Sequence, residues 1–164
     1  MLRPPPLILV ASAALAASLS AWPAEAAPKP STRTTMIKPN TRFQAGQVWA
    51  YRARPQDRGA TLTVLRVDVH PRLGTLVHIR LDGLNLRNPY TPGGVQTDVP
   101  FLPLSARALE SSVTFNLRDD APTGDFQNVY DEWRAAFDDG DAGVWSLPVR
   151  DIVDALEDAI RGAR

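Results

Sequence analysis

The chain has 164 residues, its 18 lysines and arginines balance 18 aspartates and glutamates, and it contains no cysteine. This length suits a single domain behind a leader, disulfides and a lipidated N-terminal cysteine are excluded, and the neutral balance argues against a nucleic-acid partner. The charge is nevertheless uneven, because residues 27–118 hold 13 basic and 5 acidic side chains while residues 119–164 hold 4 and 12. We favour an acidic tail packed on a basic sheet region over an arginine surface for an anionic partner.

The N-terminus has the pattern of an export signal. Arg3 precedes the apolar run LILVASAALAASLSAW, and Ala24-Glu25-Ala26 supplies small residues at the −3 and −1 positions. This pattern predicts a signal peptide over residues 1–26, since the run is shorter and less apolar than the roughly 20 residues of a membrane anchor. We therefore expect a periplasmic or secreted protein without a stable membrane anchor. Residues 27–42 are predicted to form a flexible leader, and residues 43–164 a single domain.

Three segments with alternating apolar residues, at 46–54, 61–70 and 75–86, predict an antiparallel meander. Matching the apolar faces of the last two strands pairs Val69 with Val77, Val67 with Ile79 and Leu65 with Leu81.

The same register pairs polar residues on the other face, which we expect to be the less buried one. Asp68 then lies opposite His78, and Arg66 lies opposite Arg80. The carboxylate is expected to favour the protonated form of His78. These four residues, together with Tyr90, are the candidate binding site that the sequence suggests.

The second half of the chain is predicted to be mainly helical. Residues 87–104 contain four prolines and two glycines, which indicates an ordered loop of the kind that is often functional. A helix capped by Ser105 is expected over 105–117, a short strand at 144–146 and a helix over 149–162. The clearest helix spans 125–140, with Asp125 as its N-cap and Gly140 at its end. Its aromatic stripe is expected to pack on the sheet with Trp49 and Tyr51, and consists of Phe126, Tyr130, Trp133 and Phe137.

These elements predict an α+β fold, with an antiparallel sheet of about four strands and two or three helices packed on one face.

The sequence lacks the signatures of the large enzyme classes, such as GxSxG, a P-loop, HExxH and GxGxxG. Two histidines without cysteine disfavour a transition-metal site, and DDGDAG (138–143) lacks the glycine and glutamate spacing of an EF-hand. We therefore expect neither a metal nor a cofactor. The Asp68–His78 pair has the composition of an orienting carboxylate with a general base, but no nucleophile stands out among the many serines and threonines, and a structural role is favoured.

Several segments resemble a group of small uncharacterised bacterial proteins. The matching stretches include FQAGQVWAYRARP (43–55), LGTLVHI (73–79) and YDEWRAAFDDGDAGVW (130–145). The shared motifs are F-x-x-G-Q-V-W-x-Y-x-x-R-P and Y-x-x-W-x-x-x-F. The resemblance implies one compact domain over about residues 43–160, and it implies no activity.

The expected function is that of a small exported, non-catalytic binding protein, whose partner is a protein or an anionic envelope component. Two alternatives stay open, a hydrolase that uses Asp68 and His78, and an inhibitor or immunity-type protein. The oligomeric state is open as well.

Overall fold

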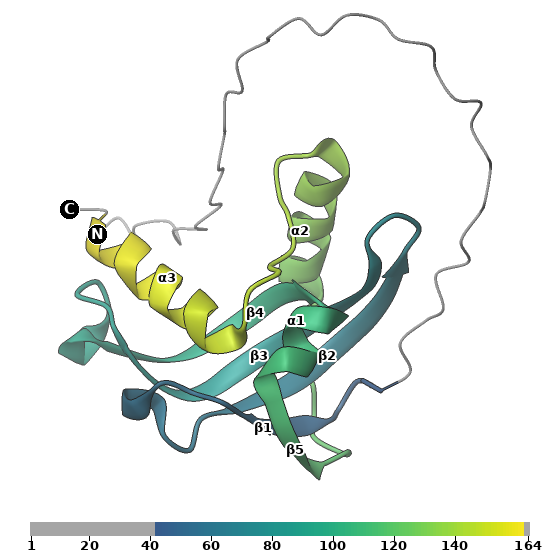
Figure 1. Cartoon of the computed structure of the whole chain (residues 1–164). Helices are drawn as coiled ribbons and strands as arrows, with labels where there is room; N and C mark the ends of the chain where they lie inside the picture. Colours follow the sequence, from purple (N-terminus) through teal and green to yellow (C-terminus); the bar gives the residue numbers. More distant parts are fainter. Residues whose placement is uncertain (1–41, 163–164) are drawn as a thin grey trace, which may run out of the picture.

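The computed structural model describes residues 42–162. The predicted signal peptide and all of the predicted leader except Arg42 lie outside the described residues. The strands and helices follow in chain order in Figure 1: β1 (Val48–Tyr51), η1 (Pro55–Asp57), β2 (Thr61–His70), β3 (Gly74–Arg87), η2 (Pro92–Gly94), β4 (Val95–Ser105), α1 (Ala106–Ser112), β5 (Val113–Arg118), α2 (Gln127–Asp139) and α3 (Val149–Gly162).

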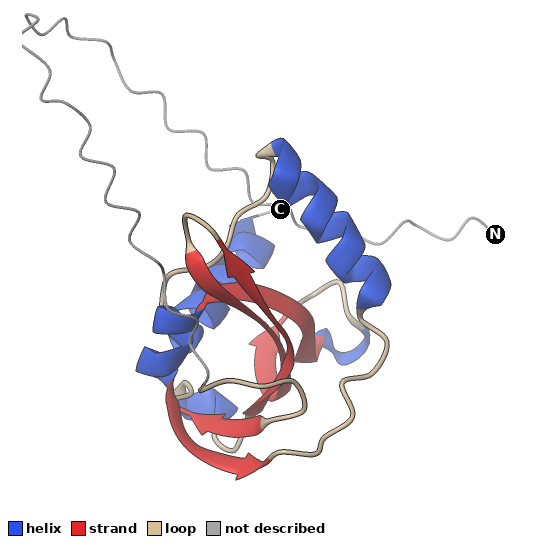
Figure 2. Cartoon of the chain, turned by 90° about the vertical axis from the view of Figure 1, so that its right-hand side faces the viewer, coloured by secondary structure: helices blue, strands red, loops and turns tan. Residues whose placement is uncertain are grey.

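The strands form one antiparallel sheet in the order β4-β3-β2-β1-β5. The predicted α+β class and the meander β1-β2-β3 are confirmed, and the sheet has five strands. The sheet is strongly curved, as Figure 2 shows. Because β5 pairs with β1, the chain returns after α1 to the edge where it began.

The segment 87–117 differs from the prediction. Residues 95–105 form β4, although their prolines suggest a loop, because an edge strand tolerates a missing N–H on its outer side. Ser105 does cap a helix, with its side chain accepting a hydrogen bond from the Ala108 N–H at 3.2 Å. That helix is short, however, since Val113–Arg118 pairs with β1 as β5.

Two helices pack on one face of the sheet, as expected. Val149, Ile152 and Val153 of α3 are fully buried against the core cluster, which also holds Leu109 of α1 and alternate residues of β3. Figure 1 shows α3 lying across this face. Burial of these apolar side chains is the main source of the domain's stability.

Helix α2 packs on the opposite face. Its partner on β3 is His78, whose neighbours Val77 and Ile79 point into the core with α3, and successive residues of a strand point to opposite faces. The predicted boundaries of α2 and α3 hold to within two residues. Gly140 ends α2 in the left-handed conformation with φ of 85°.

Three local predictions are corrected. Helix α2 begins after Phe126, and Asp125 does not cap it. Trp49 and Tyr51 belong to the core under α1 and α3, so the aromatic stripe of α2 does not pack on them. The predicted strand at 144–146 is a single parallel bridge between Trp145 and Leu104.

Among the described residues, no helix combines the length and the apolar character needed to span a membrane.

Candidate functional site

The hairpin of β2 and β3 has a different register from the predicted one. Val67 lies opposite Val77 rather than Ile79, so the pairing is shifted by two residues. The register shift between Val64 and Arg66 marks a β-bulge at Leu65, beyond which Leu62 lies opposite Leu81. As a result, Arg66 lies opposite His78, Asp68 lies opposite Leu76, and Arg80 lies opposite Thr63.

The cause of the shift is the turn. His70 lies opposite Gly74, which leaves a loop of three residues, and the Nδ1 atom of His70 accepts hydrogen bonds from the N–H groups of Arg72 and Leu73 at 3.2 and 3.1 Å. The His70 imidazole thus stabilises a turn that is shorter than the turn implied by the predicted pairing of β2 with β3.

Asp68 and His78 nevertheless meet, diagonally across the hairpin and on the same face. The Nε2 atom of His78 lies 3.1 Å from Oδ2 of Asp68. A carboxylate only accepts hydrogen bonds, so Nε2 carries the proton of the neutral imidazole. Opposite and diagonal neighbours on one face of a hairpin both come within reach of long side chains, which explains why the contact survives a two-residue shift.

Two further side chains complete the cluster around Asp68. The hydroxyl of Tyr130 in α2 donates to Oδ2 of Asp68 at 2.8 Å, and Nε of Arg66 donates to Oδ1 at 2.9 Å. The Arg66 guanidinium also lies 4.4 Å from the centre of the Tyr130 ring, within the range of a cation–π contact. We call Arg66, Asp68, His78 and Tyr130 the Asp68 cluster, and it ties α2 to the hairpin.

The electrostatics of the cluster keep Asp68 charged. Burial favours the neutral acid, but the hydrogen bonds from Tyr130 and Arg66 outweigh it and lower the pKa of Asp68. The pKa of Tyr130 is raised, by burial and by the adjacent carboxylate. Tyr130 therefore stays a hydroxyl donor and Asp68 an acceptor.

The His78 side chain is buried and packs against three aromatic rings. Its ring stacks on Phe101 at 5.4 Å and makes T-shaped contacts with Trp133 and Tyr130 at 4.8 and 5.1 Å between centroids. The side chain is 0% exposed, and its second nitrogen, Nδ1, has no hydrogen-bond partner among the described residues. The prediction that this face is the less buried one is wrong at His78, because α2 covers it.

The protonation of His78 also differs from the prediction. Burial lowers the pKa of His78 and outweighs the nearby Asp68 carboxylate, which favours the protonated form. The positive charges of Arg66 and Arg134 act in the same direction as burial. The neutral imidazole is therefore the favoured form.

In chemical terms the Asp68 cluster has two parts of a general-base arrangement, an orienting carboxylate and an imidazole with its second nitrogen free. A base must also come within hydrogen-bond distance of a substrate or a nucleophile. Here Nδ1 is excluded from solvent and the imidazole ring packs against the rings of Phe101, Tyr130 and Trp133, so the arrangement holds α2 in place and offers no route for proton exchange with a substrate.

The other two candidate residues lie apart from the cluster's centre. Arg80 lies opposite Thr63 on the face of His78, and its Nε donates to Asp82 at 2.9 Å. Tyr90 lies beyond the far end of β3, in the turn before β4, and is 60% exposed. The structure therefore brings together Asp68, His78 and Arg66, and it separates them from Tyr90.

A second buried polar cluster was not predicted from the sequence. Arg54, which is 5% exposed, donates to both carboxylate oxygens of Asp57, to Glu157 at 2.8 Å and to Asp154 at 3.2 Å. Asp57 also accepts the N–H of Asn85 at 2.7 Å. The Arg54–Asp57 spacing is visible in the sequence, but the two acids of α3 come from the end of the chain. This cluster joins the basic and acidic halves.

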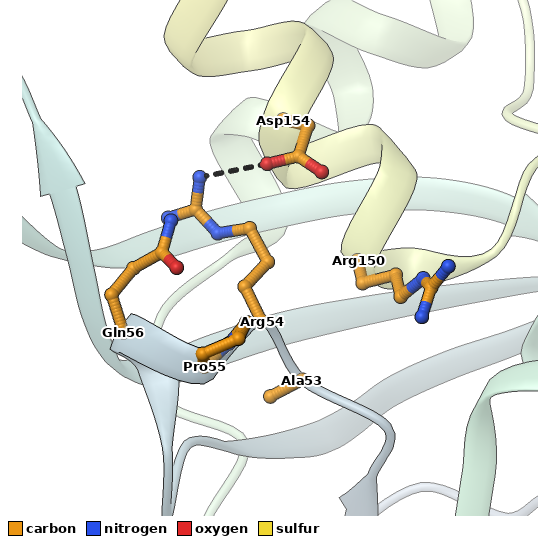
Figure 3. A pocket seen from close by; sticks show the side chains of 6 residues that line it. All are labelled: Ala53, Arg54, Pro55, Gln56, Arg150 and Asp154. Atoms are coloured by element: carbon orange, nitrogen blue, oxygen red, sulfur yellow. Dashed lines mark hydrogen bonds and ion pairs between the residues drawn. The ribbon is translucent and has the colours of Figure 1, made fainter.

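A shallow hollow of about 170 Å³ opens beside this second cluster. Figure 3 shows it between the segment Ala53–Gln56 and α3, with Arg150 on its rim and the Arg54–Asp154 ion pair across it. Three carboxylates surround Arg54, and Arg150 on the rim is paired with Asp151 at 3.1 Å, so both arginines beside the hollow already have carboxylate partners and it is a poor site for an anionic ligand.

Within residues 42–162, no group of three or more His, Cys, Asp or Glu side chains is arranged to hold a metal ion. Comparison of the sequence with protein-family models and with curated proteins, and of the structure with solved structures, gave no significant match. The function of this chain is therefore inferred from its own geometry.

Proposed function

We propose that this protein is a small exported domain that binds a partner without catalysing a reaction. The observation that carries the proposal is the burial of His78, whose Nδ1 is excluded from solvent and whose ring packs against Phe101, Trp133 and Tyr130. A histidine used as a base needs access to the substrate. The burial of His78 supports a structural role for the Asp68 cluster and disfavours the hydrolase alternative.

The charge distribution favours a protein as the partner over a uniformly anionic envelope component. Exposed arginines occur across the sheet half of the domain, at Arg58, Arg72, Arg87, Arg107 and Arg118. Exposed acids occur on α2 and just beyond it, at Asp131, Glu132, Asp138, Asp139 and Asp141, and also on α3, at Asp154 and Asp158. A surface that displays both signs matches a partner with complementary patches, and a purely anionic surface would repel α2.

The proposal is tested by affinity capture from bacterial envelope extract, with the chain from residue 27 as bait. A matched bait carries His78→Gln, which keeps a side chain able to donate to Asp68 and removes the imidazole. If His78 is structural, both baits recover the same partner to the same extent. The purified proteins are assayed in parallel on ester, phosphate and glycoside substrates.

The proposal is overturned by a hydrolytic activity of the wild type that His78→Gln abolishes while the melting curve stays nearly unchanged. Capture of a partner by the wild type that a folded His78→Gln bait fails to recover would support the binding role and overturn the structural role given to His78.

A further inference from the structure

The two edge strands of the sheet, β4 and β5, differ in how far they are protected from pairing with another strand. Edge strand β4 contains Pro100 and Pro103, and its outer side is partly covered by Trp145. The Trp145 N–H donates to the Pro103 carbonyl, and the Ser105 N–H donates to the Trp145 carbonyl, both at 2.9 Å. Prolines and a covering segment are devices that protect a sheet edge from further pairing.

The other edge strand, β5, contains no proline and is not covered by another segment within residues 42–162. No strand within residues 42–162 pairs with its outer side, and the sequence VTFNLR contains neither proline nor lysine. Its two large apolar side chains are exposed, Phe115 to 61% and Leu117 to 48%. An edge that combines unpaired backbone groups with exposed apolar side chains is a template for another strand.

The irregular pairing of β1 with β5 explains why these side chains are exposed. Val113 lies opposite Tyr51 and is buried, but register shifts on either side of Trp49 interrupt the alternation beyond it. Asn116 then takes the position opposite Trp49. Phe115 and Leu117, which flank Asn116, are left outside the core.

We infer that β5 is the edge along which two copies of this chain associate, by antiparallel pairing of Val113–Arg118 with the same strand of a second copy. The unpaired backbone groups of an edge strand can form a regular ladder of hydrogen bonds only with another extended segment. The β5 sequence suits pairing with itself, because its exposed apolar residues can lie opposite one another. A two-fold axis through Asn116 places Phe115 of each copy opposite Leu117 of the other, and Arg118 opposite Thr114. An axis through Leu117 instead would set Phe115 against Asp119.

Six residues make a small contact, so the dimer is weak and depends on concentration. This association is separate from the binding of a partner proposed above. Sedimentation velocity on the chain from residue 27, at micromolar to millimolar concentration, is expected to show the mass rising from that of one copy toward that of two.

The register is tested by two substitutions at the exposed positions, Phe115→Lys and Leu117→Asp. Each alone should lower dimerisation at least tenfold, while an equimolar mixture should restore it, because the lysine of one variant then faces the aspartate of the other. Leu73→Asp is the matched control, since Leu73 is 50% exposed in the turn between β2 and β3, and it should leave the association unchanged.

Hydrogen exchange of the wild type gives a measurement that does not depend on the variants. Protection of the amides of residues 115–117 should rise with protein concentration. The inference is overturned if the protein is a single copy at every concentration with unchanged exchange in β5. It is also overturned if both variants still dimerise, or if their mixture stays as single copies.

Discussion

Two buried tyrosines give a paired test of the Asp68 cluster. The hydroxyl of Tyr130 donates to the Asp68 carboxylate at 2.8 Å, whereas the hydroxyl of Tyr51 is buried without a hydrogen-bond partner among the described residues. Substitution by phenylalanine removes the same single atom at both positions. Because the two hydroxyls differ in their partners, we expect the two substitutions to affect stability in opposite directions.

The magnitudes follow from the contacts. A hydrogen bond to a charged group contributes about 1.5–3 kcal/mol. The Asp68 side chain is 17% exposed and keeps Arg66 and His78 as partners, so Tyr130→Phe should cost about 1.5 kcal/mol, the lower end of that range. Tyr51→Phe removes a hydroxyl that is buried without a hydrogen-bond partner among the described residues. Burial also raises the pKa of the Tyr51 hydroxyl. The substitution should be neutral or stabilise the domain by up to about 1 kcal/mol.

The assay is urea unfolding of the chain from residue 27, followed by tryptophan fluorescence and fitted to a two-state transition. An unchanged slope with a shifted midpoint identifies a change in stability. The expectation is refuted if Tyr130→Phe stays within about 0.5 kcal/mol of the wild type, or if Tyr51→Phe destabilises the domain as much as Tyr130→Phe does.

Three further predictions concern His78, the Arg54 cluster and α2. Burial lowers the pKa of His78 in the folded protein, so its contribution to stability is fully present above about pH 6.5, the ordinary pKa of histidine. This contribution is lost as the pH falls toward the pKa of His78 in the folded protein. Urea unfolding at several pH values should show this loss of stability, and His78→Gln should abolish this pH dependence. Arg54→Met should cost about 3–5 kcal/mol, because it removes the cationic partner of Asp57, which is 1% exposed. Arg150→Met, at a side chain 59% exposed, should change the free energy of unfolding by less than about 0.5 kcal/mol. Trp133→Ala should lower the free energy of unfolding by about 2 kcal/mol, less than the loss expected for a fully buried indole, because Trp133 is only half-buried. A loss below about 0.5 kcal/mol would show that the indole contributes little to the packing around His78.

The errors in the predicted hairpin have a physical origin. Apolar alternation along β2 and β3 specifies which residues share a face, and the two-residue shift of residues 66–70 leaves the face of each of these residues unchanged. The pattern could therefore predict that Asp68 and His78 lie together, but it could not select their register. The turn decides the register, and the hydrogen bonds of the His70 ring to the backbone are not visible in the alternation.

The burial of His78 could not be predicted because it depends on an element distant in sequence. A histidine between Val77 and Ile79 has the pattern of a polar residue on the solvent face of a sheet. Whether that face is open depends on α2, whose aromatic stripe is evident in the sequence but is equally compatible with the face of Trp49 and Tyr51. The choice between two faces of one sheet depends on long-range packing, and a periodic pattern carries no information on it.

Strands β4 and β5 were not predicted from the sequence, for a different reason. The prolines of residues 87–104 argue against a central strand, and β4 lies at an edge, where they are tolerated. The apolar spacing of Leu109, Val113 and Leu117 fits a helix, yet pairing with β1 takes Val113–Arg118 into the sheet. Tertiary contacts outweigh local propensity in such short segments.

The structural role of His78 is tested most directly by its protonation state, read from long-range ¹⁵N–¹H correlation spectra of the imidazole as a function of pH. We expect a neutral ring with its proton on Nε2 and an unprotonated Nδ1, and a titration midpoint below the ordinary value of about 6.5. A midpoint above that value, or a ring that exchanges protons freely with solvent at neutral pH, would contradict the conclusion that His78 is sealed beneath α2.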